Sequence, residues 1–386
     1  MPKPPFAPED AIAQLRRDGY NIELIEGAVL VHDVPAVDET RTVRRITLGD
    51  PLQYAGDQLQ PPTDHTLYFC GDHPCDDQGN QLTRIVAGPD SSVLGPGAIA
   101  QFRLSSKPPS GQYEDLHAKI THYIELIERW AQAIEPGITA RTFHQVGGDP
   151  PNASPFRYAD SATPHAGIAD LGAKLRGQRL AVIGAGGTGS FVLDLLIKTA
   201  VAEIHLYDGD VLLSHNAFRA PGAISLEALR ARPSKATYWA NQAGAMRTGV
   251  IAHDQYVTAD DAPELAQFDF VFLAVDDGPA RGDLVAALEA HGVSFIDVGM
   301  GVDRAGRDGQ LLGAIRVSVS TPQARAHVPT GTGRDIYGSN IQVAELNALN
   351  AALAVIAWKR LNGFYLDAVR GTTSIYSTDD NTIAEG

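Results

Sequence analysis

A glycine-rich hexapeptide, Gly184-Ala185-Gly186-Gly187-Thr188-Gly189, lies between a short apolar run and a helical pattern. In a phosphate-binding loop of this spacing, Gly184 permits the tight turn, Gly186 lets the backbone approach a phosphate, and Gly189 allows the helix to pack closely. The N–H groups and the positive end of the following helix would then face the anion. The loop therefore predicts a nucleotide-binding site.

An acid, an amide and a guanidinium follow this loop along the chain. Asp208 ends the next predicted strand, at the position where a carboxylate accepts hydrogen bonds from ribose hydroxyls. Asn216 and Arg219 come shortly after it. A dinucleotide-dependent dehydrogenase needs neither of them, whereas Arg219 could fork onto phosphate oxygens and Asn216 could bond ribose or phosphate. This set favours a protein that holds a triphosphate.

A lysine and an aspartate complete the candidate site. Lys235 follows a Pro-Ser pair, and Asp276 comes directly after the apolar run Phe270–Val275. A carboxylate at the carboxyl end of a parallel strand lies at the ligand crevice of such a sheet. Because Mg²⁺ binds through one or two carboxylates together with phosphate oxygens, Asp276 is the candidate magnesium ligand.

The elements that position these residues alternate between strand and helix. Short apolar runs are typical of buried strands, and apolar residues three or four apart are typical of helices. Their alternation predicts βαβ units and an α/β, Rossmann-like fold with a mainly parallel sheet. The expected strands are Arg179–Ile183, Glu203–Tyr207, Phe268–Val275 and Ser294–Val298, and the expected helices are Gly189–Ala200, Leu284–His291 and Asn347–Leu361.

The first part of the chain has a different pattern of expected helices and strands, which predicts a smaller α+β domain. Its clearest feature is Tyr113–Ile134, in which an apolar stripe at helical spacing predicts a core-facing helix. A short helix and several strands are also expected, at Asp10–Arg17, Ile22–Val34, Thr66–Phe69 and Ile85–Val86. A Pro- and Gly-rich segment, Gly147–Ala153, separates this first part from the α/β part that follows it. We expect the smaller domain over 1–146, the nucleotide-binding domain over 150–370, and a mobile polar tail over 371–386.

The charge, the lengths of the apolar runs and the number of cysteines exclude several classes of protein. The 386 residues carry 31 basic and 46 acidic side chains, a net charge of −15, which argues against nucleic-acid or anionic-membrane partners. The chain has neither an apolar signal core at its N-terminus nor a run of the roughly 20 apolar residues that a membrane span needs. Two cysteines, Cys70 and Cys75, exclude a disulfide scaffold. These features predict a soluble cytoplasmic protein.

Residues 150–365 resemble the ThiF/MoeB/HesA superfamily, the ubiquitin-activating-enzyme-like adenylyltransferases. The resemblance consists of ordered blocks. The glycine loop corresponds to the family's G-x-G-G-x-G, and Asp208, Asn216 and Arg219 correspond to its D…N…R spacing. The remaining blocks are the family lysine at Lys235, the T-D-N-x-x-x-R block at Asp276 and Arg281, and the R-Y segment at Phe156-Arg157-Tyr158.

The resemblance implies an adenylation reaction that uses ATP and Mg²⁺. The C-terminal carboxylate of a ubiquitin-like protein or peptide would attack the α-phosphorus of ATP and release pyrophosphate. By the same resemblance Arg219, Lys235 and Arg157 would neutralise the phosphates, while Asp276 would hold Mg²⁺. The nucleotide itself would be bound by Gly184, Gly186, Gly187, Gly189, Asp208, Asn216, Arg219 and Lys235.

The resemblance also implies an assembly. In relatives the arginine of the R-Y segment reaches an active site across a dimer, so a homodimer is expected. The region before the ThiF-like part resembles segments that precede ThiF domains in bacterial ubiquitin-like modification systems. This favours a partner-binding role for residues 1–146, with a conjugating-type protein as a further candidate partner.

The sequence departs from the family pattern at several points. Ala220-Pro221 stands where a glutamine usually follows the arginine, and the segment from Arg219 to Lys235 is longer than in simple relatives. Residues 76–386 contain no cysteine, which excludes a thioester nucleophile and a tetrathiolate zinc site in the adenylation domain.

Both thiols lie in Cys70-Gly71-Asp72-His73-Pro74-Cys75, for which three interpretations are open. In the first, Cys70 is a small buried residue on a strand and Cys75 is a turn residue. In the second, one of them is a catalytic or carrier thiol whose pKa His73 lowers. In the third, both bind a metal together with His65 and His73. Cys75, in a Pro-containing turn, is expected to be the more exposed of the two.

Two other functions stay open beside adenylation. The glycine loop alone also fits an NAD-dependent oxidoreductase, against which Asn216, Arg219 and Asp276 argue. Because the second domain has no thiol, the third hypothesis is a non-catalytic nucleotide-binding scaffold whose N-terminal domain recruits partners.

Overall fold

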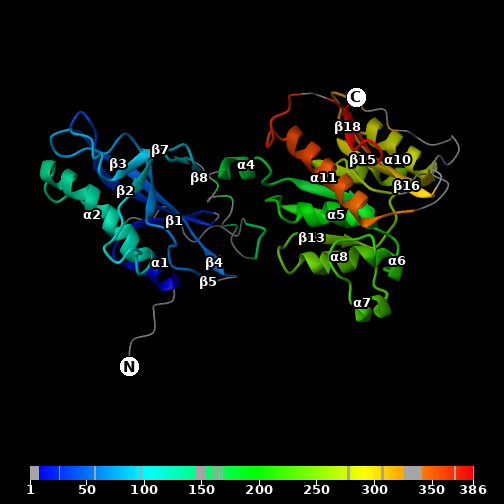
Figure 1. The fold of residues 1–386 in the computed structure, drawn as a ribbon, viewed down its shortest axis with the longest axis horizontal. Coiled ribbons are helices and arrows are strands. Elements are labelled where there is room, and N and C mark those ends of the chain that lie inside the picture. The colour runs from blue at the N-terminus through cyan, green and yellow to red at the C-terminus, as the bar shows by residue number, and fades with distance from the viewer. Residues whose placement is uncertain are drawn as a thin grey trace. The chain divides into compact units, whose positions relative to one another are not determined.

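The computed structural model divides the chain into two compact units, Met1–Ala173 and Lys174–Gly386 (Figure 1). The residues that the structure describes are 8–25, 27–55, 58–95, 97–143, 154–157, 160, 163, 166, 168–275, 279–305, 308–325, 328, 341–368 and 371–385.

The first unit is built on a six-stranded antiparallel sheet in the order β1-β2-β3-β6-β10-β7. Its strands are β1 (Asn21–Ile25), β2 (Ala28–Val37), β3 (Val43–Pro51), β6 (Thr66–Cys70), β7 (Val86–Pro89) and β10 (Phe102–Ser105). Two small hairpins pair β4 (Tyr54–Ala55) with β5 (Gln58–Leu59) and β8 (Val93–Gly95) with β9 (Ala98–Ile99). The helices are α1 (Pro8–Arg17), α2 (Leu116–Ile134) and α4 (Ala169–Ala173).

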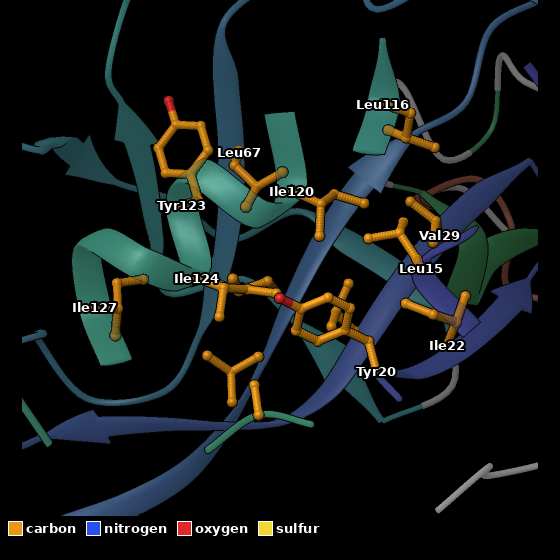
Figure 2. Packing of buried hydrophobic residues seen from close by; sticks show 14 of the residues in the cluster. Leu15, Tyr20, Ile22, Val29, Leu67, Leu116, Ile120, Tyr123, Ile124 and Ile127 are labelled. Atoms are coloured by element: carbon orange, nitrogen blue, oxygen red, sulfur yellow. The ribbon is translucent and has the colours of Figure 1, made fainter. Parts of the chain in front are cut away.

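Helix α2 supplies the apolar stripe that the sequence predicts. Ile120, Tyr123 and Ile127 are buried in one core cluster with Leu15 of α1 and Leu67 of β6, as Figure 2 shows. The helix begins at Leu116 because the Asp115 side chain accepts a hydrogen bond from the N–H of Ala118 and so caps it. The prediction of a start at Tyr113 was therefore wrong by three residues.

The second unit contains an eight-stranded sheet in the order β13-β12-β11-β14-β15-β16-β17-β18. Strands β13 to β15 are parallel in this order, and β15 to β18 are antiparallel. The strands are β11 (Arg179–Ile183), β12 (Glu203–Tyr207), β13 (Val250–His253), β14 (Phe270–Leu273), β15 (Phe295–Ala305), β16 (Gln310–Ser320), β17 (Thr373–Ser377) and β18 (Thr382–Glu385). The α/β class with a Rossmann-like core is confirmed.

Helices of the second unit connect and cover these strands. Helices α5 and α11 pack against each other, and α11 also packs against β15 and β16 (Figure 1). The helical segments are α5 (Gly187–Leu196), α6 (Ser214–Ala217), α7 (Leu226–Ala231), α8 (Lys235–Ala243), the 3-10 turn Ala259–Asp261, α9 (Ala262–Leu265), α10 (Pro279–Ala290) and α11 (Ala344–Leu361). No helix in the described part of the chain combines the length and apolar character that a membrane span requires.

The C-terminal tail differs from its prediction. Residues 371–386 were expected to be mobile because they are polar, yet β17 pairs with β16 and β18 pairs with β17. Strand β16 offers a row of backbone N–H and C=O groups at the edge of the sheet, and pairing satisfies these groups whatever the polarity of the side chains.

Candidate functional site

The glycine loop turns sharply at the carboxyl end of β11. Gly184 has a φ of 93°, a left-handed conformation that favours glycine. A Cβ on Gly184 would lie 2.3 Å from the carbonyl oxygen of Ala274, and one on Gly189 would lie 1.8 Å from that of Gly184. These two glycines are therefore required by close backbone packing, as the spacing predicted.

The other two glycines of the loop have different surroundings. A Cβ on Gly187 would lie 2.4 Å from the Nδ2 atom of Asn347, because α11 crosses the start of α5 at this point. A Cβ on Gly186, the N-cap of α5, would meet no atom within 4 Å among the residues that the structure describes. The space above the helix N-terminus is thus open at Gly186, where the N–H groups can approach an anion.

Asp208 stands beside this loop. Its Oδ2 accepts a hydrogen bond from the N–H of Ala185 at 2.7 Å, and its Oδ1 accepts one from the N–H of Asp210 at 2.8 Å. These bonds fix the carboxylate against the backbone of the loop. Each oxygen keeps a second lone pair with which it can accept a ribose hydroxyl.

Lys235 reaches the same carboxylate from another element. It is the first residue of α8, whose N-cap Ser234 accepts a hydrogen bond from the N–H of Thr237. The buried Lys235 ammonium lies 2.7 Å from Oδ2 of Asp210 and 3.8 Å from Oδ1 of Asp208. Its hydrogen bond is the main reason why the pKa of Asp210 lies below its usual value. A cation is thus held next to the glycine loop.

Asn216 and Arg219 bring two buried donors to this part of the unit. The Oδ1 of Asn216 accepts from the N–H of Leu213 at 2.8 Å, whereas its Nδ2 is buried without a hydrogen-bond acceptor in the described part of the chain. The Nε of Arg219 is likewise buried without one. Buried donors of this kind are costly unless they find an acceptor, and phosphate or ribose oxygens fit both.

Asn347 is the residue that the sequence analysis missed. Its Oδ1 accepts from Thr188 Oγ1 at 2.7 Å, and its Nδ2 donates to the carbonyl of Arg219 at 3.4 Å. It therefore joins the glycine loop to the segment that carries the arginine. An asparagine inside a mostly apolar helix was the available signal, because a buried amide needs polar partners.

Not every predicted site residue belongs to this geometry. Asp276, the candidate magnesium ligand, lies outside the described residues. Arg157 belongs to the first unit, where it is exposed, so its place at the site stays a prediction. Arg281 is buried and pairs with Asp297, which Arg316 also contacts at 2.7 Å. Its ion pair gives Arg281 a structural part within the second unit.

The structure corrects the prediction for the thiols. Cys75 is 1% exposed and Cys70 is only partly buried, the reverse of the expected order. The N–H of Cys75 bonds to the carbonyl of Val37, which draws the turn onto the core. Burial raises the pKa of Cys70 to about 12 and that of Cys75 to about 11, which contradicts the one interpretation in which His73 lowers the pKa of a thiol. In the described part of the chain, no three His, Cys, Asp or Glu residues form a group that could hold a metal.

The two units also match different protein families. Residues 161–357 match the ThiF family, a span of more than half of the chain. The chain belongs to the ThiF family. This confirms the resemblance on which the sequence interpretation depended. In this ThiF-family protein, residues 10–161 match a domain of unknown function, DUF6791. No curated protein matches the chain.

Solved structures with a similar fold include MccB of E. coli and PaaA. The MccB structure with succinimide is 15% identical, covers 57% of this chain and 67% of its own, and has a TM-score of 0.45. The MccB structure with ATP is 14% identical, with the same coverage and TM-score. The PaaA structure is 14% identical, covers 74% of this chain and 92% of its own, and has a TM-score of 0.46.

Proposed function

We propose that the second unit is an ATP-dependent adenylyltransferase that activates the C-terminal carboxylate of a peptide or ubiquitin-like protein. The observation that carries this proposal is the position of Lys235 beside Asp208, whose carboxylate accepts a hydrogen bond from the N–H of Ala185 in the glycine loop. Lys235 is held beside the loop, and the buried donors of Asn216 and Arg219 lack an acceptor in the described residues. A dinucleotide site has less need of two extra cations, whereas a triphosphate carries the charge that they balance.

Each group then has a part in the reaction. The substrate carboxylate oxygen attacks the α-phosphorus of ATP, the bond to the β-phosphate breaks, and pyrophosphate leaves. Charge builds on the transferred and departing phosphates, and Lys235 and Arg219 offset it. Asp208 orients the ribose, and the N–H groups at Gly186 and Gly187 orient the phosphates. Mg²⁺, which Asp276 would hold, supplies further charge compensation when bound.

The same proposal assigns a part to the first unit. Arg157 would reach the phosphates of a second copy of the chain, so that the enzyme works as a homodimer. Mixing an inactive Arg157→Ala chain with an inactive Arg219→Met chain tests this arrangement. Partial recovery of activity in the mixture would support shared sites, and two inactive chains that stay inactive would argue against them.

Ligand-induced stabilisation tests the nucleotide assignment first. The melting temperature should rise by a few degrees with ATP and Mg²⁺ at about 100 times Kd, because this occupancy adds roughly 2.7 kcal/mol. The rise should shrink for Asp276→Ala and Arg219→Met and stay intact for Arg230→Met, an exposed arginine of α7. A rise with NAD⁺ and none with ATP would support the oxidoreductase instead.

The products that form from ATP test whether the protein catalyses adenylation. Exchange of labelled pyrophosphate into ATP, or formation of AMP in the presence of a carboxylate substrate, supports adenylation. ATP binding with no AMP and no exchange, across a panel of peptide and ubiquitin-like C-termini, would leave the non-catalytic scaffold as the better description.

A further inference from the structure

Tyr256 is a mostly exposed aromatic residue beside the acids of the candidate site. It follows β13, and 68% of its surface is exposed. Its hydroxyl donates a hydrogen bond to Oδ1 of Asp210, whose Oδ2 contacts the ammonium of Lys235. Asp210 therefore stands between the lysine and the tyrosine ring. Because Asp210 is two residues from Asp208 and bonds to it, the ring lies close to the carboxylate proposed to orient the ribose.

The Tyr256 ring occupies the space in which a side chain of Gly209 would lie. A Cβ on Gly209 would be 2.6 Å from both Cδ2 and Cε2 of the ring, and 2.8 Å from its Cγ. The absence of a side chain at Gly209 thus lets the ring approach the backbone between Asp208 and Asp210. This contact and the hydrogen bond to Asp210 together fix the orientation of the ring.

The backbone on both sides of Tyr256 is also anchored. Asp254 accepts hydrogen bonds from the hydroxyls of Ser234 and Thr237, which ties it to the start of α8. On the other side, Val257 packs partly buried against a core cluster of the second unit. The ring is therefore exposed but held in place. A ligand that binds to a side chain held in this way causes little further loss of conformational entropy.

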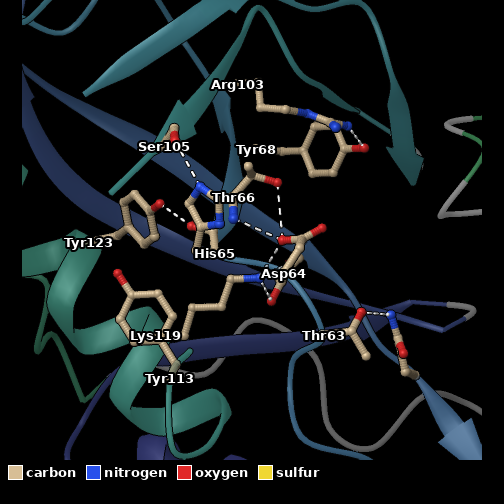
Figure 3. Close-up of polar contacts among 12 residues, drawn as sticks. Thr63, Asp64, His65, Thr66, Tyr68, Arg103, Ser105, Tyr113, Lys119 and Tyr123 are labelled. Atoms are coloured by element: carbon tan, nitrogen blue, oxygen red, sulfur yellow. Dashed lines mark hydrogen bonds and ion pairs between the residues drawn. The ribbon is translucent and has the colours of Figure 1, made fainter. Parts of the chain in front are cut away.

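Two contacts of the first unit show the contrasting case, in which a side chain has its partner within the chain. The buried ammonium of Lys119 lies 2.8 Å from Oδ2 of Asp50. The guanidinium of Arg103 lies 4.3 Å from the centroid of the Tyr68 ring, and Figure 3 shows these two side chains together. Neither a cation nor a second aromatic ring lies against Tyr256 in the part of the chain that the structure describes. Its ring is accessible to a ligand.

The position of this ring suits the base of a nucleotide. The base is joined directly to the ribose, so a ribose at Asp208 brings the base to the residues around that acid. The phosphates extend from the opposite end of the ribose, toward the N–H groups at Gly186. Nucleic-acid bases stack on aromatic side chains through their π-faces, without needing hydrogen bonds to the base. Tyr256 supplies such a surface next to the proposed ribose site.

We propose that Tyr256 stacks against the base of the bound nucleotide and favours ATP over CTP. The two fused rings of a purine cover more of the tyrosine ring than the single ring of a pyrimidine does, so they gain more from stacking. This inference rests on the nucleotide site proposed for the second unit, to which it adds a residue that binds the base. Tyr256 contacts none of the reacting atoms in this arrangement.

The experiment measures the binding of ATP, CTP and inorganic tripolyphosphate, each with Mg²⁺, to the full chain by calorimetry. Tyr256→Leu should weaken ATP binding about tenfold, a loss within the range for one stacked base. It should reduce the preference for ATP over CTP, and it should leave tripolyphosphate binding unchanged because this ligand has no base. Tyr256→Phe loses only the hydroxyl that bonds to Asp210, and it should bind ATP nearly as tightly as the wild type.

A second readout and a matched control accompany these titrations. Stacking should move the adenine H2 and H8 resonances of ATP upfield on binding to the wild type, and Tyr256→Leu should remove this shift. Tyr365→Leu is the control, since Tyr365 is 45% exposed and lies beyond the end of α11, whereas Asn347 is in the first turn of that helix. Its affinity for ATP should equal that of the wild type.

The results distinguish failure of this inference from failure of the nucleotide site. A wild type that binds neither ATP nor tripolyphosphate would contradict the site itself, and the part of Tyr256 with it. A wild type that binds ATP, together with a Tyr256→Leu chain that melts normally and binds ATP equally well, would overturn the part of Tyr256 alone. An equal loss of ATP and tripolyphosphate binding in Tyr256→Leu would also overturn it, because the ring would then support the phosphate-binding residues and not the base.

Discussion

The ammonium of Lys235 lies 2.7 Å from Oδ2 of Asp210, and this pair stands beside the carboxylate of Asp208. Lys235 therefore already has a partner before any phosphate arrives. Asp210 is the more exposed of its two acids, at 53% of the side chain against 9% for Asp208. An incoming phosphate can replace Asp210 at the ammonium without leaving a buried carboxylate uncompensated.

The first prediction follows from this exchange of partners. Lys235→Met should weaken ATP binding by roughly 10–100-fold, since a hydrogen bond to a charged group contributes about 1.5–3 kcal/mol. The fold should survive, because Asp208 keeps its two backbone N–H donors. Isothermal calorimetry with ATP and Mg²⁺ measures the change. Lys198→Met, at an exposed ion pair with Asp194 just beyond the end of α5, is the matched control and should leave the affinity unchanged.

The second prediction uses two glycines of one loop that differ only in their surroundings. Gly189→Ala places a Cβ against the backbone oxygen of Gly184, which cannot move away without distorting the turn. Overpacking of this kind costs about 3 kcal/mol, so the melting temperature should fall by roughly 6–12 °C. Gly186→Ala meets open space and should melt within about 2 °C of the wild type.

ATP binding should distinguish the same two variants in the opposite way, because Gly186→Ala keeps its stability but should lose binding. The Cβ added at Gly186 projects into the space at the helix N-terminus that a phosphate would fill, so Gly186→Ala should lose ATP-induced stabilisation while its fold stays intact. If Gly186→Ala binds ATP as the wild type does, the phosphates lie elsewhere and the proposed site is misplaced.

The elements nearest the site were the ones that the sequence predicted best. Strands β11 and β12 have the predicted bounds, because each is a short and mostly buried run of residues that turn residues bound on both sides. The prediction for β15 ended at Val298, because Gly299 and Gly301 interrupt the strand pattern there. The strand continues to Ala305, and its long pairing with β16 stabilises this second half. Long-range pairing of this kind leaves little trace in local sequence.

The site shows the same division between local and distant signals. The glycine loop, Asp208 and Lys235 lie close together in the structure. The loop and Asp208 follow neighbouring parallel strands, whose carboxyl ends meet at one edge of the sheet. Asn347 was missed because its partners are more than a hundred residues away in sequence. The burial of Cys75 was missed because it depends on a bond to Val37 on another strand.

The third prediction concerns the thiols. Both cysteines have a raised pKa, so little thiolate exists at neutral pH, and neither should react with iodoacetamide in the folded chain at pH 7.5 within an hour. Cys70→Ala and Cys75→Ala should therefore leave adenylation unchanged, with Cys75→Ala less stable because it empties buried volume. Mass spectrometry of the alkylated chain provides the measurement. Rapid labelling of Cys75, or loss of activity in Cys75→Ala at normal stability, would revive the carrier-thiol interpretation.

The last prediction links Asp50 to the pH dependence of stability. Burial raises its pKa to about 6 in the folded chain, from 3.8 when it is free. Between these two values the folded state holds a proton that the unfolded state has released, so this contribution to stability is complete below pH 3.8 and is lost as the pH rises through 6. The loss is of the order of 3 kcal/mol at most, from 1.36 kcal/mol for each pKa unit.

Asp50→Asn isolates this effect because its amide does not titrate. The melting temperature of the wild type should fall relative to the variant by several degrees between pH 4 and pH 6.5. Asp38, whose pKa is lowered to about 2 by the hydrogen bond from Thr40, acts with the opposite sign below that window and is common to both chains. The double variant Asp50→Asn/Lys119→Met removes both members of the buried pair and should show the same flat profile. A difference between wild type and Asp50→Asn that stays constant from pH 4 to 6.5 would mean that Asp50 is ionised throughout, fully compensated by Lys119.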